Sequence, residues 1–130
     1  MKAFITSIIV LIIFTTLVIT NSIYTAHLCG EYYDKTKKAV STENTETPPS
    51  DLSKELEYFK EIKENWDKEK NMVNLSISHD HINEVDQNIV SVIGACETNN
   101  YTIYNLYLQR TLNSFETLEN LSKLKLDNII

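Results

Sequence analysis

The chain has 130 residues, of which 42% are apolar and 23% charged, and its formal net charge is −6. This length allows one small domain, and 2 glycines with 2 prolines are too few for the frequent turns of a β-sandwich or β-barrel. Arg110 is the only arginine. With the acidic balance, this argues against nucleic acid as a partner, because such proteins need a basic surface.

An uncharged apolar segment lies near the start of the chain, between residues 3 and 26. Its core, residues 3–20, would span about 27 Å as a helix rising about 1.5 Å per residue, close to the thickness of a bilayer core. No A-x-A cleavage site follows the apolar run. We therefore predict an uncleaved transmembrane anchor over residues 1–26, with a cleaved signal peptide, or lipidation at Cys29, as the alternatives.

The expected location is a bacterial cell membrane, crossed once. A very short tail ahead of a strong apolar run usually stays cytoplasmic, so we expect the C-terminal domain to be extracytoplasmic. The many Asn and Ile residues are typical of an AT-rich bacterial genome. The N-x-S/T matches at Asn74, Asn100 and Asn120 are therefore interpreted as chance matches.

Residues 27–40 contain helix formers and no proline, which predicts a juxtamembrane extension of the same helix. Residues 41–50 read STENTETPPS and have no apolar side chain except the two prolines, which predicts a linker. The domain boundaries are thus an anchor over 1–26, an extension over 27–40, a linker over 41–50 and a helical domain over 51–130.

Three amphipathic helices are predicted within residues 51–130, because apolar residues recur there at helical steps. Ser50 or Asp51 is expected to cap the first helix and Ser78 or Asp80 the second, and the Asn99–Asn100 pair suits the turn before the third. The third helix is expected to fade near Lys123. The apolar faces contain Leu52, Leu56, Phe59, Ile62, Trp66 and Val73; Ile82, Val85, Ile89, Val92 and Cys96; and Tyr101, Tyr104, Leu108, Leu112, Phe115, Leu118 and Leu121.

We therefore predict an all-α fold: an N-terminal transmembrane helix followed by a small antiparallel three-helix bundle. At about 80 residues the bundle core would be small, so the membrane helix, a second copy or another protein is expected to supply further packing surface. Trp66, Phe59 and Tyr104 are the predicted partner-contact residues.

The run from Trp66 to Ile82 with its His79–Asp80 pair, followed by Asp86 and the Asn-Ile-Ile ending, resembles a small bacterial family, domain of unknown function 4363. The resemblance covers nearly the whole chain. It implies a short N-terminal anchor, a helical remainder and no known activity, and it favours a role beside other membrane proteins.

His79, His81 and Glu84 are the metal-ligand candidates, since zinc accepts imidazole and carboxylate ligands. Residues two apart on a helix point about 200° from each other, so the two histidines converge only if one precedes the helix. The alternative is a plain helix start, with Asp80 at the positive end of the helix dipole. No resident metal or cofactor is predicted.

Cys29 and Cys96 are the two cysteines, and spacing alone leaves open whether they pair. No nucleophile-and-base pair with usable context is present, which argues against a hydrolase. We therefore expect a non-enzymatic, single-pass membrane protein whose acidic helical domain packs on a partner, either another membrane protein or a second copy. The alternative is an extracytoplasmic solute- or metal-binding sensor domain.

Overall fold

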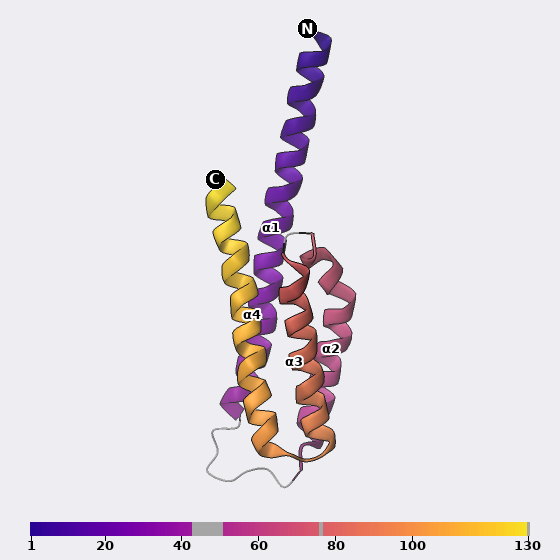
Figure 1. The fold of residues 1–130 in the computed structure, drawn as a ribbon, viewed down its shortest axis with the longest axis vertical. Helices are drawn as coiled ribbons and strands as arrows, with labels where there is room; N and C mark the ends of the chain where they lie inside the picture. Colours follow the sequence, from indigo (N-terminus) through magenta and orange to yellow (C-terminus); the bar gives the residue numbers. More distant parts are fainter. Residues whose placement is uncertain (43–50, 76, 130) are drawn as a thin grey trace.

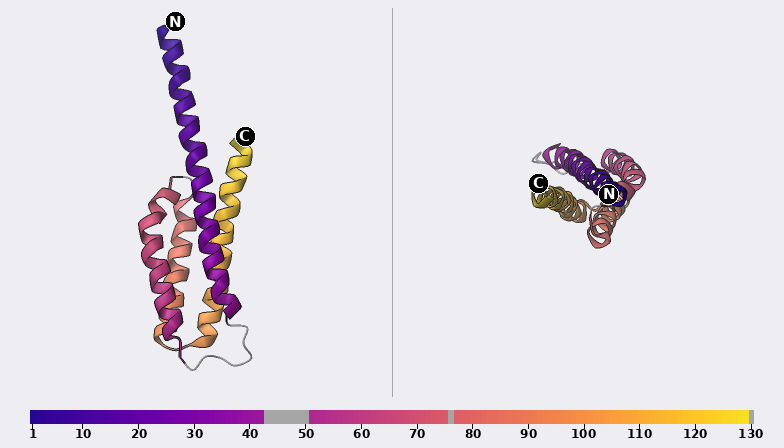
Figure 2. Two further views of the ribbon diagram at one scale, coloured as in Figure 1. Left: turned by 180° about the vertical axis from the view of Figure 1, so that it is seen from behind. Right: turned by 90° about the horizontal axis from the view of Figure 1, so that it is seen from above.

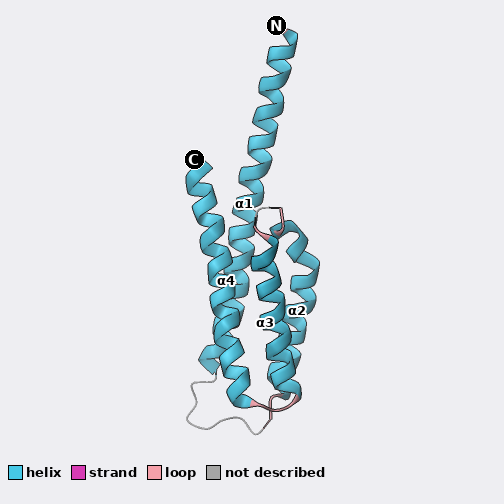
Figure 3. Cartoon of the chain, viewed as in Figure 1, coloured by secondary structure: helices cyan, strands magenta, loops and turns pink. Residues whose placement is uncertain are grey.

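The computed structural model describes residues 1–42, 51–75 and 77–129, and these residues form four helices and no strand. The helices are α1 (Lys2–Thr42), α2 (Ser53–Val73), α3 (His79–Glu97) and α4 (Tyr101–Ile129). They run roughly parallel to one long axis (Figures 1 and 3). The predictions of an all-helical chain and of a long apolar N-terminal helix are confirmed. The predicted linker falls largely on residues 43–50, which lie outside the described residues.

The predicted anchor and its extension form one continuous helix of 41 residues, α1. Its N-terminal half projects alone beyond the other helices, whereas its C-terminal half lies alongside them (Figures 1 and 2). The most extensive helix pair is α1 with α4, followed by α3 with α4. The helical domain is therefore not limited to three helices, because half of α1 packs against it as a fourth.

A stripe of mostly small side chains on α1 explains this packing. Its members recur at alternating steps of three and four residues, the spacing of a helix seam that faces a partner helix. Small side chains at such a seam let two helix backbones approach closely, and α4 presents buried small residues of its own. The α1 stripe consists of Ser22, Thr25, Cys29, Tyr32, Thr36 and Ala39, and the buried small residues of α4 are Thr111, Ser114 and Ser122.

The apolar faces predicted for the other helices form the rest of the core. All five predicted residues of α3 are buried, and so are most of those on α2 and α4. The turn between α3 and α4 has the predicted left-handed residue, Asn99, at φ 53°. Its side-chain oxygen accepts a hydrogen bond from the backbone N–H of Leu52 at 3.1 Å. The α3–α4 turn is thereby tied to the N-cap residue of α2.

Three helix ends can be compared with the predictions, and only the N-cap position of α3 agrees. Leu52 rather than Asp51 occupies the N-cap position of α2, although Asp51 accepts a hydrogen bond from the backbone N–H of Ser53. Ser50, the other predicted cap, lies outside the described residues. Ser78 occupies the N-cap position of α3 without a capping side-chain hydrogen bond. The last helix does not fade near Lys123 but continues to Ile129, because Ser122 is buried against the bundle and keeps that turn packed.

Candidate functional site

Trp66 lies at the centre of the bundle and is fully buried. Its ring meets Tyr32 of α1 edge-on at a centroid distance of 5.4 Å and Phe115 of α4 at 5.4 Å, while Tyr32 and Phe115 stack at 5.3 Å. Edge-to-face and offset-stacked pairs at these separations are favourable beyond their area burial. This aromatic cluster therefore joins three helices, and α1 supplies one of its three rings.

Phe59 and Tyr104 form a second aromatic contact, with ring centroids 6.1 Å apart and planes at 77°. Both side chains are fully buried, as is Trp66. In this fold the three residues predicted to contact a partner instead pack inside the bundle. The physical reason is that the C-terminal half of α1 covers the apolar surface that three helices alone would have exposed.

A chain of polar contacts links α2 to α3 beside Trp66. The indole Nε1–H donates to Asp86 Oδ1 at 2.7 Å, and Asp86 Oδ2 pairs with Lys70 Nζ at 3.1 Å. The hydrogen bond from Asp86 is the main reason that the pKa of Lys70 is raised. Lys70 also pairs with Asp67 at 3.4 Å, and Asp67 with Lys63 at 2.6 Å. This seam satisfies the one polar atom that the tryptophan brings into the core.

A buried amide contributes a second specific contact, between α3 and α4. Asn88 Nδ2 donates to Ser114 Oγ at 2.6 Å, and the Ser114 hydroxyl donates to the backbone oxygen of Arg110 at 2.8 Å. A buried, hydrogen-bonded asparagine between helices favours one register over others. Asn88 was not singled out from the sequence, although its place beside the apolar Ile89 in a regular stripe was a signal available there.

The metal-ligand candidates do not converge. Within the described ranges, no group of three or more His, Cys, Asp or Glu side chains is positioned to hold a metal ion. His79 is exposed at the start of α3, where its Nδ1 lies 3.1 Å from Asn74 Oδ1. His81 is half-buried and Glu84 is exposed. The arrangement is that of a helix start on the surface.

Both cysteines are buried, and no disulfide joins them. Cys29 lies in the α1 stripe and Cys96 at the end of the α3 stripe. Burial, reinforced by the charge of Glu119, raises the pKa of the Cys29 thiol from 9.0 to about 12. The thiol is therefore protonated and poorly reactive at neutral pH.

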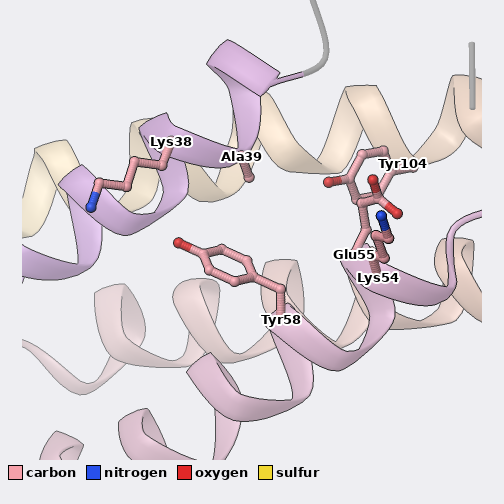
Figure 4. A pocket seen from close by; sticks show the side chains of 6 residues that line it. All are labelled: Lys38, Ala39, Lys54, Glu55, Tyr58 and Tyr104. Carbon is pink, nitrogen blue, oxygen red and sulfur yellow. The ribbon is translucent and has the colours of Figure 1, made fainter.

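A shallow recess of about 320 Å³ opens between the C-terminal end of α1 and the start of α2 (Figure 4). Tyr58 lies in it with its hydroxyl donating to the backbone oxygen of Lys35 at 2.7 Å. Among the side chains that the structure describes, its lining includes no serine, cysteine or histidine. The lining residues are Lys38, Ala39, Lys54, Glu55, Tyr58 and Tyr104.

The projecting half of α1 is the other distinctive surface. It is apolar and long enough to cross a membrane, and its most apolar stretch is not buried against any of the described residues. Its hydroxyl groups bond back to carbonyls one turn earlier on the same helix, at 2.8–2.9 Å. Comparisons with protein-family models, curated proteins and solved structures found no match to this chain.

Proposed function

We propose that this chain is a single-pass membrane protein without enzymatic activity, in which one helix both crosses the bilayer and completes an acidic helical bundle that binds a partner protein. We place the bundle outside the cytoplasmic membrane of a bacterium. The observation that carries the proposal is the division of α1 into an exposed apolar half and a buried half with no break between them.

The exposed half of α1 suits lipid better than water. Phe4, Leu11 and Phe14 each leave more than 60% of their surface uncovered, and their neighbours are apolar as well. A continuous apolar surface of this size on a soluble protein is rare and marks an interaction site. In hydrocarbon every polar group needs an internal partner, and the hydroxyls of Thr6 and Thr15 have one in the helix backbone.

Helix continuity gives the proposed anchor a mechanical role. Because α1 passes from the apolar half into the core without a loop, the bundle cannot turn freely relative to the membrane. The surface it offers to a neighbour is therefore held at a fixed height and direction. A fixed presentation lowers the entropy lost on binding another membrane protein.

The outer faces of α3 and α4 are the surfaces we assign to partner contact. Val90 on α3 is 52% exposed, and Leu106 on α4 is 45% exposed. These positions replace Trp66, Phe59 and Tyr104 as the residues to probe. The proposed role agrees with what the resemblance to domain of unknown function 4363 implies, namely a helical membrane protein that accompanies others.

Photo-crosslinking in native membranes tests the proposal. A photoreactive residue at Val90 or Leu106 should give a discrete crosslinked band that mass spectrometry identifies, whereas one at the buried Ile89 should give none. The proposal is contradicted if both exposed positions yield only the monomer while the protein stays in the membrane fraction. Extraction of the protein by carbonate wash would contradict the anchor itself.

The orientation has its own test. Protease added to the outer face of intact cells should digest the bundle and leave a membrane-embedded N-terminal fragment. Digestion confined to the N-terminal tip would reverse the proposed topology.

A further inference from the structure

The bundle has exposed apolar side chains at the end from which the apolar half of α1 projects. Leu75, in the turn after α2, is 71% exposed, Leu124 on α4 is 57% exposed, and Met72 is 47% exposed. The α2–α3 turn and the C-terminal end of α4 both lie at this end of the bundle (Figure 1). We call Met72, Leu75 and Leu124 the apolar rim.

Two contacts show how far along α1 this rim lies. Asn21 Nδ2 donates to the backbone oxygen of Met72 at 3.2 Å, which ties the end of α2 to α1 just past its apolar core. Gly30 faces Glu119, whose Oε1 would lie 3.4 Å from a Cβ at that glycine. Since α1 and α4 run in opposite directions with the same rise of about 1.5 Å per residue, the end of α4 at Ile129 is level with about Thr20.

A recess joins the rim to the apolar half of α1. It has a volume of about 350 Å³. One wall comes from α1, and the other comes from the turn after α2 and from α4. Leu75 therefore shares a depth with α1 residues that belong to the apolar segment. The lining residues are Phe14, Leu17, Val18, Asn21, Leu75 and Lys125.

We infer that the apolar rim is seated in the surface of the lipid bilayer beside α1, with Leu75 inserted below the headgroups and Leu124 at the level of the headgroups. This inference rests on the proposed membrane anchor. If residues 3–20 cross the bilayer, Leu75 is at the same depth as Leu17, and lipid is the occupant that already surrounds its neighbour. The long stem of Lys125 allows its ammonium to reach the headgroup region from that position.

The inference makes the bundle a partly embedded domain rather than one suspended above the membrane. Three parts of the chain then contact lipid: the α2–α3 turn, the C-terminal end of α4 and the span itself. Such a contact adds to the constraint that α1 places on the orientation of the bundle.

An environment-sensitive fluorophore on single cysteines tests the inference in the full chain. The background carries Cys29→Ala and Cys96→Ala, and its helicity is checked by circular dichroism. The protein is reconstituted alone into phosphatidylcholine vesicles, and each labelled position is exposed to iodide in the water and to lipids carrying a quencher on the acyl chain.

The labelled positions are Leu75→Cys and Leu124→Cys, with Ile12→Cys as a probe of the span and Thr102→Cys as an exposed control at the opposite end of the bundle. The inference predicts blue-shifted emission, quenching by the labelled lipid and severalfold weaker iodide quenching at Leu75, approaching the values at Ile12, and values between those of Ile12 and Thr102 at Leu124. Iodide-accessible labels at both rim positions, equal to Thr102, with a lipid-quenched label at Ile12 would overturn the inference and leave the anchor standing. An iodide-accessible label at Ile12 would overturn the anchor and the inference together.

Discussion

Replacing Tyr32 tests whether α1 is part of the bundle core. The ring of Tyr32 is buried between Trp66 and Phe115, with centroid distances of 5.4 and 5.3 Å. Truncation of a large buried aromatic side chain to alanine costs about 3–5 kcal/mol of unfolding free energy. We therefore expect Tyr32→Ala to lower the stability of the bundle by that amount.

The matched variant Tyr32→Phe keeps the ring and removes only the hydroxyl. That hydroxyl oxygen is buried beside the carboxylate of Glu69, whose charge and hydrogen bond add to burial in raising the pKa of Tyr32. A side-chain hydrogen bond contributes about 0.5–1.5 kcal/mol net, so we expect Tyr32→Phe to cost at most about that much, well below the cost of Tyr32→Ala. Tyr24→Ala, a truncation of an exposed tyrosine on the same helix, serves as the second control.

The assay is denaturant unfolding in detergent micelles, followed by helical circular dichroism and by the emission of the chain's single tryptophan. Because Trp66 touches Tyr32, its emission reports directly on that contact. A loss below about 1 kcal/mol for Tyr32→Ala, equal to that of Tyr24→Ala, would refute the packing of α1 in the core.

Three further variants test separate parts of the structure. Asp86→Ala leaves the indole N–H of Trp66 unpaired and should cost about 1–3 kcal/mol of unfolding free energy. Asp86→Asn retains an acceptor and should cost less. Equal losses of stability in the two variants would contradict the hydrogen bond. Gly94→Ala should raise stability by about 0.5–1 kcal/mol, because a Cβ there meets nothing within 4 Å; a lower melting temperature would contradict this. Since folding raises the pKa of Cys29 from 9.0 to about 12, its contribution to stability is complete below pH 9 and is lost as the pH rises toward 12. Melting temperatures from pH 8 to 11 should therefore fall more steeply for the native chain than for Cys29→Ala, and parallel curves would contradict this.

The helices could be predicted from the sequence because their apolar residues recur at helical steps. The α3 stripe from Ile82 to Cys96 is buried as expected, and Asn99 ends that helix in the left-handed conformation. The membrane helix was one of the expected sources of packing surface, but no periodic apolar stripe singled it out. Its buried face mixes serine and threonine with small apolar residues, so hydropathy does not mark that face.

The same uncertainty bears on the predicted partner-contact residues. The sequence analysis left open whether the membrane helix, a second copy or another protein covers the large aromatic residues of α2 and α4, and in the structure the bundle itself buries them. Tyr32 of α1 supplies part of that covering through its ring contacts with Trp66 and Phe115. The sequence signal that predicts a buried face on α1 is the recurrence of mostly small residues at steps of three and four from Ser22 to Ala39.

Alkylation of Cys29 measures the central claim most directly, since the claim is that α1 joins the bundle beyond its membrane span. The measurement uses a Cys96→Ala chain in native membranes and a water-soluble maleimide at pH 8. A matched chain carries Cys29→Ala, Cys96→Ala and Glu31→Cys, which moves the thiol to an exposed position two residues along the same helix.

The account predicts fast labelling at position 31 and labelling at least tenfold slower at Cys29, because Cys29 is fully buried and its pKa is raised to about 12. Denaturant should then make the two rates equal. Equal rates in the native membrane would contradict the account, because they would show α1 standing apart from the other three helices.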